Sequence, residues 1–218
     1  MGGLSWDDGE RRRLQSYFLG AAGRERPRVL FVPTATGDSA EATLMAYTQL
    51  SGQADVSHLL FHPWPPSGLR EYTLDQDLIF ISGGNTANAL AIWRAHGFDR
   101  ILREAWEAGI VLAGWSAGMI CWFEAGVTDS FGPQLEGMRD GLGFLPGSAC
   151  PHYDGEDQRR PVYTRLVAEG FPPGVAADDT VALRYDGTAL SEVVTARPTA
   201  CAYRVTPDGE EPLETRAL

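Results

Sequence analysis

The sequence predicts an α/β fold, a three-layer αβα sandwich with a mostly parallel central sheet. Short apolar runs such as Leu78–Ile81 have no polar side to turn toward water, which is typical of parallel strands buried on both faces. Amphipathic segments such as Phe98–Glu107 alternate with these runs along the chain. Strand and helix in alternation predict helices packed on both sides of one sheet.

The first half of the chain holds four expected strands. The first, residues 28–33, ends in Thr-Ala-Thr-Gly, and Ser39 can cap a helix that runs to residue 50. The second strand, residues 56–61, enters a proline-rich connector at residues 63–68. The third and fourth strands, residues 77–81 and 110–113, end in Ser-Gly-Gly-Asn and Gly-Trp-Ser-Ala-Gly. The other expected elements are helices at 86–95, 98–107, 117–124 and 162–169 and strands at 181–185 and 200–205.

Length, charge and composition limit the classes of function that the chain can have. The length of 218 residues fits one domain, 1–218, with residues 1–25 as an irregular or helical N-terminal segment. The net charge of −11 argues against nucleic acid as a partner, because phosphates need a basic face. No run approaches the ~20 apolar residues of a membrane span, and the N-terminus does not read as a secretory signal.

Metal and disulfide chemistry are not expected either. The three cysteines, Cys121, Cys150 and Cys201, are widely spaced and odd in number, which favours reduced thiols in a cytoplasmic protein. His58 and His62 are four residues apart, but they lie where a strand meets prolines rather than on one face of a helix. We therefore predict no metal and no cofactor.

Ser116 is the candidate nucleophile. In a parallel sheet the functional loops gather at the carboxyl ends of the strands, which directs attention to residues 34–38, 82–86 and 114–118. The third of these loops has the Gly-x-Ser-x-Gly pattern of a nucleophile elbow, in which glycines allow a sharp turn from strand to helix. The helix N-terminus then brings the Ala117 amide to a developing oxyanion. The alternative is a packing turn of small residues without chemistry.

The loop at residues 82–86 can complete such a site. The amides of its glycines, Gly84 among them, can form the other half of an oxyanion hole. The same loop is also explained as a turn in which Asn85 or Thr86 caps the next helix, and both interpretations can hold together. It lacks the patterns of nucleotide-binding loops.

A serine nucleophile needs a base, and the chain has four histidines. His96 stands before Gly97 where a helix is expected to end, whereas His152 lies in a loop of small and polar residues and is the better base. The orienting acid stays open. Asp129, Asp178 and Asp179 are candidates, and at most one of the two adjacent aspartates can face the site from an extended segment.

Four segments together resemble the peptidase E group of serine peptidases, which is related to cyanophycinase. They are Phe-Val-Pro-Thr-Ala at 31–35, Ile-Ser-Gly-Gly-Asn-Thr at 81–86, Gly-Trp-Ser-Ala-Gly at 114–118 and Pro-His-Tyr at 151–153, and the resemblance covers residues 26–205. It implies a class I glutamine amidotransferase-like (flavodoxin-like) fold with serine in place of cysteine. The usual first strand of that fold is barely present, since residues 1–6 look only like its tail, and a bare sheet edge would favour a homodimer.

The resemblance also assigns roles. It implies Ser116 as nucleophile and His152 as base, with Asp178 as the third member and Asp179 and then Asp129 as fallbacks. The oxyanion donors would be the amides of Gly84 and Ala117. The residues expected to bind substrate are Asn85, Arg159 and Arg160.

The implied activity is that of a serine exopeptidase that forms an acyl-enzyme with short peptides, in particular dipeptides with N-terminal aspartate. An arginine that follows the catalytic histidine would hold the substrate carboxylate. Two other hypotheses remain. One is an acyl hydrolase or esterase that uses the same site, and the other is a homologue that binds a small molecule without turnover.

Overall fold

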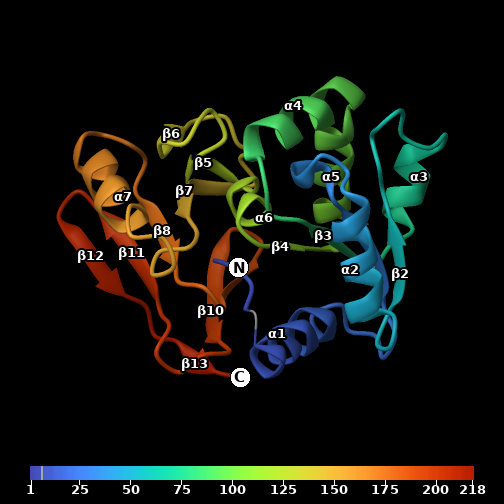
Figure 1. Cartoon of the computed structure of the whole chain (residues 1–218), viewed down its shortest axis with the longest axis horizontal. Helices are drawn as coiled ribbons and strands as arrows, with labels where there is room; N and C mark the ends of the chain where they lie inside the picture. The colour runs from blue at the N-terminus through green and yellow to red at the C-terminus, as the bar shows by residue number, and fades with distance from the viewer. Residues whose placement is uncertain (6) are drawn as a thin grey trace. The chain divides into compact units, whose positions relative to one another are not determined.

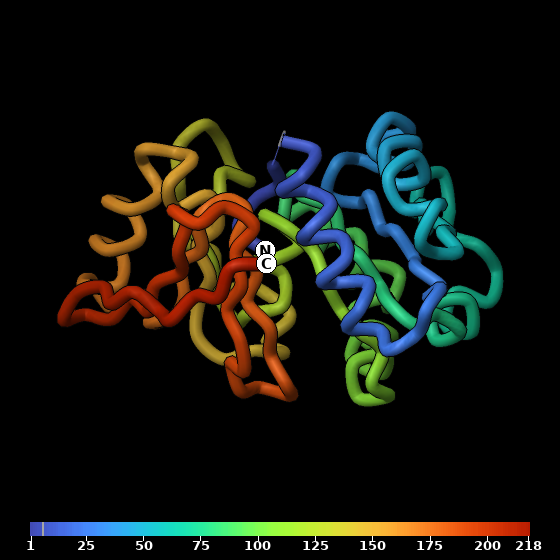
Figure 2. The backbone as a smooth tube through the Cα atoms, turned by 90° about the horizontal axis from the view of Figure 1, so that it is seen from below, coloured from blue at the N-terminus to red at the C-terminus, as the bar shows by residue number. Residues whose placement is uncertain are grey.

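The computed structural model describes residues 1–5 and 7–218, so Trp6 of the expected N-terminal tail lies outside the described residues. The residues gather into two compact units, one formed by Gln15–Gly118 and the other by Met1–Leu14 with Met119–Leu218. The chain passes between the units inside α1 (Asp8–Gly20) and inside α6 (Ala117–Ile120), as can be followed in Figure 2. Each unit is described by itself below.

The unit Gln15–Gly118 contains a four-stranded parallel sheet in the order β2-β1-β3-β4 (Figure 1). The central strands β1 (Arg28–Val32) and β3 (Leu78–Ile81) are almost wholly buried, which explains their apolar sequences. The outer strands are β2 (Asp55–His58) and β4 (Val111–Gly114). The helical segments are η1 (Thr34–Thr36), α2 (Ala40–Leu50), α3 (Leu69–Leu74), α4 (Thr86–His96) and α5 (Phe98–Glu107). The predicted alternation of strand and helix is confirmed in this unit.

Local signals explain most of these boundaries. The side chain of Ser39 accepts a hydrogen bond from the Ala42 amide at the start of α2, as expected of an N-cap. Gly97 has φ of 70° and ends α4 in the left-handed conformation. The second strand ends earlier than predicted, at His58, because the Phe61 amide donates to the Asp38 side chain at 2.6 Å instead of extending the sheet.

The second unit holds a six-stranded mixed sheet in the order β12-β11-β8-β7-β5-β6 and a three-stranded sheet in the order β13-β10-β9. Its helix α7 (Arg159–Ala168) packs beside β11 (Figure 1). The pairs β5–β7 and β7–β8 are parallel. The strands are β5 (Phe123–Thr128), β6 (Glu136–Met138), β7 (Leu145–Cys150), β8 (Gly174–Ala177), β9 (Val181–Asp186), β10 (Ala189–Thr195), β11 (Ala202–Thr206), β12 (Gly209–Pro212) and β13 (Arg216–Ala217).

One predicted helix is wrong over half its length. The expected helix at 117–124 is a single turn, α6, and β5 begins at Phe123. Phe123 pairs with Leu145 of β7 as β5 begins, and Gly126 of β5 packs closely on the Ile120 side chain. Within the described part of the chain, no helix is both long and apolar enough to cross a membrane.

Candidate active site

The loops that follow β1, β3 and β4 meet at one edge of the four-stranded sheet, as predicted. Val32 pairs with Ile81, and Ile81 pairs with Gly114, so the three strands end level with one another. The Asn85 amide donates to the Ala35 carbonyl at 2.7 Å. A Cβ placed on Gly83 would lie 3.3 Å from the Cβ of Ser116, so the glycine loop after β3 lies directly against the candidate nucleophile.

Ser116 has φ of 54°, in the left-handed region that residues with a Cβ rarely adopt. Close packing accounts for the flanking glycines: a Cβ on Gly114 or Gly118 would approach the Ile81 carbonyl oxygen to 2.6 Å or 2.4 Å. Packing does not account for the serine, because glycine would adopt this φ at lower cost. The strained, incompletely buried Ser116 therefore favours the nucleophile elbow over a simple packing turn.

Gly84 and Ala117 are the predicted oxyanion donors. Gly84 has φ of 125°, and any Cβ there would lie 2.2 Å from the Ala35 carbonyl oxygen, so only glycine fits. Among the described residues, the backbone hydrogen bonds of turns, loops and caps include none that is donated by the amide of Gly84 or of Ala117. The side-chain oxygen of Asn85 accepts from the Asn88 amide at 2.8 Å and caps α4. A contact between Asn85 and substrate stays a prediction.

His152 lies in the second unit and is oriented by a carboxylate. Its Nδ1 is 2.7 Å from Oδ1 of Asp179, and the side chains are 20% and 24% exposed. Because a carboxylate accepts hydrogen bonds, this contact assigns the donor role to Nδ1 of His152. Nε2 is then the nitrogen that can accept a proton from a nucleophile.

The first choice for the orienting acid, Asp178, does not bind His152 in this structure, and its catalytic role stays a prediction. Its carboxylate instead accepts a hydrogen bond from the Cys201 amide at 2.8 Å. The adjacent carboxylates do point different ways, and the fallback Asp179 is the one on the imidazole. The other candidate, Asp129, is exposed in the turn after β5.

Burial raises the pKa of Asp178 to about 6 from its usual value near 3.8, and the nearby charges of Asp154 and Asp179 act in the same direction. The Cys201 hydrogen bond and Arg160 oppose that rise. A raised folded-state pKa means that the folded chain binds the proton more tightly than the unfolded chain, so this group lowers stability as pH rises from about 4 through about 6. Asp178 is 5% exposed, so little solvent screens this effect.

We therefore expect Asp178→Asn to raise the free energy of unfolding by roughly 1–3 kcal/mol at about pH 7, with little change at about pH 4. The amide oxygen of asparagine can still accept from Cys201, so the hydrogen bond survives the change. Urea denaturation at the two pH values measures this. An equal gain at both would show that the effect does not come from the charge of Asp178.

The two arginines after His152 are already engaged by the protein. Arg159 is 3% exposed, and its guanidinium donates to Glu156 at 2.7 Å and to the Val127 carbonyl at 2.8 Å. The expectation that Arg159 holds a substrate carboxylate is therefore not carried further. Arg160 is half-exposed, stacks over the rings of Tyr153 and Tyr203, and pairs with Glu210 at 2.9 Å.

The sequence alone did not identify two supports of the His152–Asp179 pair. Asp154 lies only two residues after His152, and its Oδ1 accepts a hydrogen bond from the Asp179 amide at 2.7 Å. Gly3 forms a parallel bridge with Asp179, and a Cβ on Gly3 would lie 1.9 Å from Oδ1 of that residue. The signal available in the sequence was the pair of glycines at residues 2–3, which permits such close approach.

Comparison with known proteins shows which family the chain resembles. Residues 1–193 match peptidase family S51. The chain is 48% identical over 207 residues to an uncharacterized peptidase, YgaJ, of Bacillus subtilis strain 168, a match that covers 94% of this chain and 88% of that protein. It is 25% identical over 182 residues to peptidase E of Shewanella denitrificans, which covers 79% of this chain and 77% of the relative.

Two solved structures share the fold. A peptidase from an acI-B1 actinobacterium has a TM-score of 0.66 at 19% identity, with 99% of this chain and 92% of that chain covered. A putative peptidase E protein from Listeria monocytogenes EGD-e has a TM-score of 0.62 at 21% identity, with coverage of 90% and 97%. These likenesses confirm the predicted fold class.

Proposed function

This chain belongs to peptidase family S51 and is a peptidase, and we propose that it is a serine exopeptidase that hydrolyses short peptides through an acyl-enzyme. Ser116 is the proposed nucleophile and His152 the proposed general base. Asp179, rather than Asp178, is the proposed orienting acid, because it is the carboxylate on the imidazole.

The backbone of Ser116 is the observation that carries this proposal. A residue with a side chain is held at φ of 54° between two glycines that pack on the neighbouring strand. Strain of this kind costs about 1–3 kcal/mol and is concentrated at functional sites. The His152–Asp179 pair supports the same proposal independently, since it has the hydrogen bond that keeps a catalytic imidazole in its reactive tautomer.

The proposed chemistry uses groups of this chain at each step. Nε2 of His152 takes the hydroxyl proton of Ser116 as Oγ attacks the scissile carbonyl, and Asp179 stabilises the resulting imidazolium. The amides of Gly84 and Ala117 stabilise the oxyanion. The imidazolium then protonates the departing amine, and a water molecule, deprotonated by His152, releases the acid product.

The proposed substrates are dipeptides with N-terminal aspartate. Arg160 is the remaining candidate for the substrate carboxylate, because two tyrosine rings hold its guanidinium plane and a carboxylate, Glu210, already binds it. A substrate would have to displace or share that interaction. This requirement favours a small substrate carboxylate, which can accept two hydrogen bonds from the guanidinium, over a neutral side chain.

A panel of substrates tests the specificity. We expect release of free amino acids from Asp-X dipeptides, with kcat/KM at least about tenfold above that for the matched Asn-X dipeptides, because only the aspartate carries the charge that an arginine recognises. N-terminally blocked Asp-X serves as the control for exopeptidase action. Hydrolysis of p-nitrophenyl esters with none of any dipeptide would replace the peptidase proposal with an esterase.

A further inference from the structure

The loop that carries His152 holds Asp179 at two points. His152 binds its carboxylate, and Asp154, two residues later, accepts its backbone amide at 2.7 Å. The Glu156 amide donates to the His152 carbonyl and closes this loop as a turn. The direction of the Asp179 side chain therefore depends on where the Asp154 carboxylate lies.

The Asp179 carboxylate has little room to adjust. A Cβ on Gly3 would lie 1.9 Å from its Oδ1, and a Cβ on Gly155 would lie 2.5 Å from its Oδ2, so the backbones of two glycines enclose it. Thr180, the next residue, has φ of 72°, and its amide donates to the Gly3 carbonyl at 3.1 Å. A small shift of the Asp179 backbone must therefore move the carboxylate relative to the imidazole.

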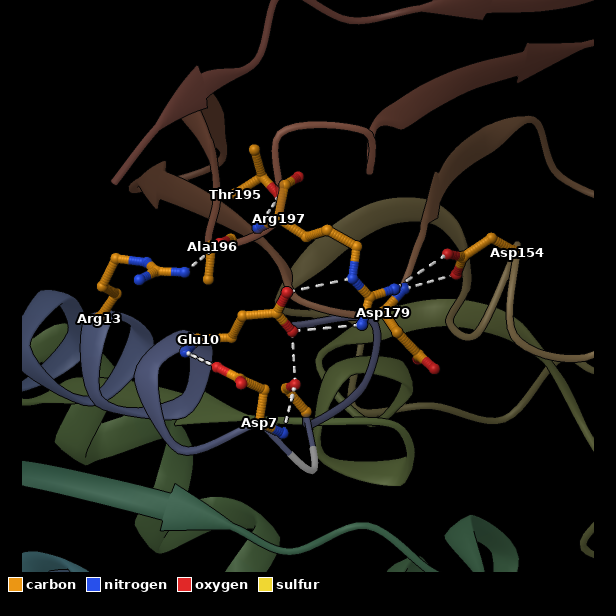
Figure 3. Close-up of polar contacts among 9 residues, drawn as sticks. Asp7, Glu10, Arg13, Asp154, Asp179, Thr195, Ala196 and Arg197 are labelled. Carbon is orange, nitrogen blue, oxygen red and sulfur yellow. Dashed lines mark hydrogen bonds and ion pairs between the residues drawn. The ribbon is translucent and has the colours of Figure 1, made fainter.

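Arg197 is the cation that faces Asp154. Figure 3 shows its guanidinium between Glu10 and Asp154, with Nη1 3.7 Å from Oδ2 of Asp154 and with bonds to both carboxylate oxygens of Glu10 at 3.2 and 3.3 Å. Thr195 fixes the backbone of Arg197, because its hydroxyl accepts a hydrogen bond from the Arg197 amide and donates one to the Arg197 carbonyl. Hydrogen bonds to Glu10 and the charges of Glu10, Asp154 and Asp179 raise the pKa of Arg197, so it remains charged.

Arg197 offsets an excess of acid around His152. Four acidic groups come from three segments: Glu10 from α1, Asp154 from the loop after β7, and Asp178 and Asp179 from the turn after β8. A second cation that acts on this region, Arg160 of α7, is bound to Glu210. Without Arg197, repulsion among the carboxylates would turn Asp154 away from Asp179 and toward solvent.

We propose that Arg197 is a positioning residue for the His152–Asp179 pair: anchored by Glu10, it holds the Asp154 carboxylate against the Asp179 amide. The inference rests on the proposed function in that it takes this pair as the catalytic base and its orienting acid. Asp154 and Arg197 are 37% and 38% exposed, so their ion pair contributes little to stability. The ion pair instead sets the direction of the hydrogen bond that the Asp179 amide donates to Asp154.

The test compares Arg197→Met with Arg13→Met. Arg13 is the matched control, because its guanidinium also joins α1 to this segment, through the Ala196 carbonyl at 2.7 Å, but it is not bonded to Asp154 (Figure 3). We expect Arg197→Met to lower kcat about 10- to 100-fold with KM changed less than about threefold, as for a misplaced catalytic group. Arg13→Met should keep kcat, and Arg197→Lys should recover most of it.

A second measurement does not depend on turnover. The ¹⁵N chemical shifts of the His152 ring, assigned with His152→Gln, report which nitrogen carries the proton. We expect Arg197→Met to reduce the fraction protonated at Nδ1, and Arg13→Met to leave it unchanged. Asp154→Asn, which keeps the acceptor oxygen but removes the charge that faces Arg197, should show the same loss to a smaller degree and replaces Arg197→Met if that variant does not fold.

The outcomes separate the two proposals. Equal behaviour of the Arg197 and Arg13 variants in both measurements, or an unchanged Nδ1 population in Arg197→Met, would overturn the positioning role. A wild-type protein that cleaves no peptide would overturn the proposed function instead, and the ¹⁵N comparison would still decide the role of Arg197.

Discussion

We expect Ser116→Ala to abolish peptide hydrolysis, with kcat reduced roughly 10⁵-fold, while the fold is retained. The expected loss is this large because the substitution removes only the hydroxyl group, which is the proposed nucleophile that forms the acyl-enzyme. Alanine keeps the side-chain Cβ, so the strained backbone at φ of 54° is not altered by the change. Steady-state kinetics on the best dipeptide of the panel and covalent labelling with a fluorophosphonate measure the effect.

Two further variants make the result specific. Ser67→Ala, at an exposed serine of the proline-rich connector, should label and turn over like the wild type. Ser116→Gly should be as inactive as Ser116→Ala but more stable, by about 1 kcal/mol, because glycine adopts the left-handed conformation without strain. Retained labelling in either Ser116 variant would mean that another residue is the nucleophile.

The sequence was most informative where a local pattern has a local cause. The turn at 114–118 could be predicted because its glycines are needed for contact with Ile81, and because a strand ends and a helix begins there. His152 was selected as the candidate base among four histidines, and the structure places its imidazole on the carboxylate of Asp179. The caps at Ser39 and Asn85 follow from the same kind of short-range hydrogen bond.

Strands made of small residues were harder to find. β7 (Leu-Pro-Gly-Ser-Ala-Cys) and β8 (Gly-Val-Ala-Ala) each have only one large apolar residue, unlike the apolar runs that marked β1 and β3. Their burial comes from pairing with neighbours that are distant in sequence. Strand propensity depends on such context, which a single sequence does not contain.

The position of Arg159 could have been read from the sequence. In α7 the buried residues are Arg159, Tyr163 and Val167, which are four residues apart and so lie on one face of the helix. Two apolar residues at i+4 and i+8 therefore already placed Arg159 on the inner face and Arg160 on the outer one. The role of Arg197 had no such signal, because its partners Glu10 and Asp154 are far from it in the chain.

The choice between Asp178 and Asp179 rests on the tertiary structure alone. The two residues have the same side chain and adjoining positions, so no pattern separates them. The Asp178 carboxylate accepts a hydrogen bond from the Cys201 amide and so lies away from His152. Thr180, at φ of 72°, turns the chain, and the Asp179 carboxylate contacts His152. This selection gives a matched pair of variants with opposite expected results.

Asp179→Asn should lower kcat about 10³- to 10⁴-fold with a small change in KM, because an amide that donates to Nδ1 would stabilise the imidazole tautomer that cannot act as base. Asp178→Asn, the same substitution one residue earlier, should keep kcat within about threefold, since that carboxylate bonds to a backbone amide and not to the imidazole. Kinetics on one dipeptide and the ¹⁵N shifts of His152 measure both. If instead Asp178→Asn lost the activity and Asp179→Asn retained it, the hydrogen bond at 2.7 Å would be structural, and the acid implied by family resemblance would be the catalytic one.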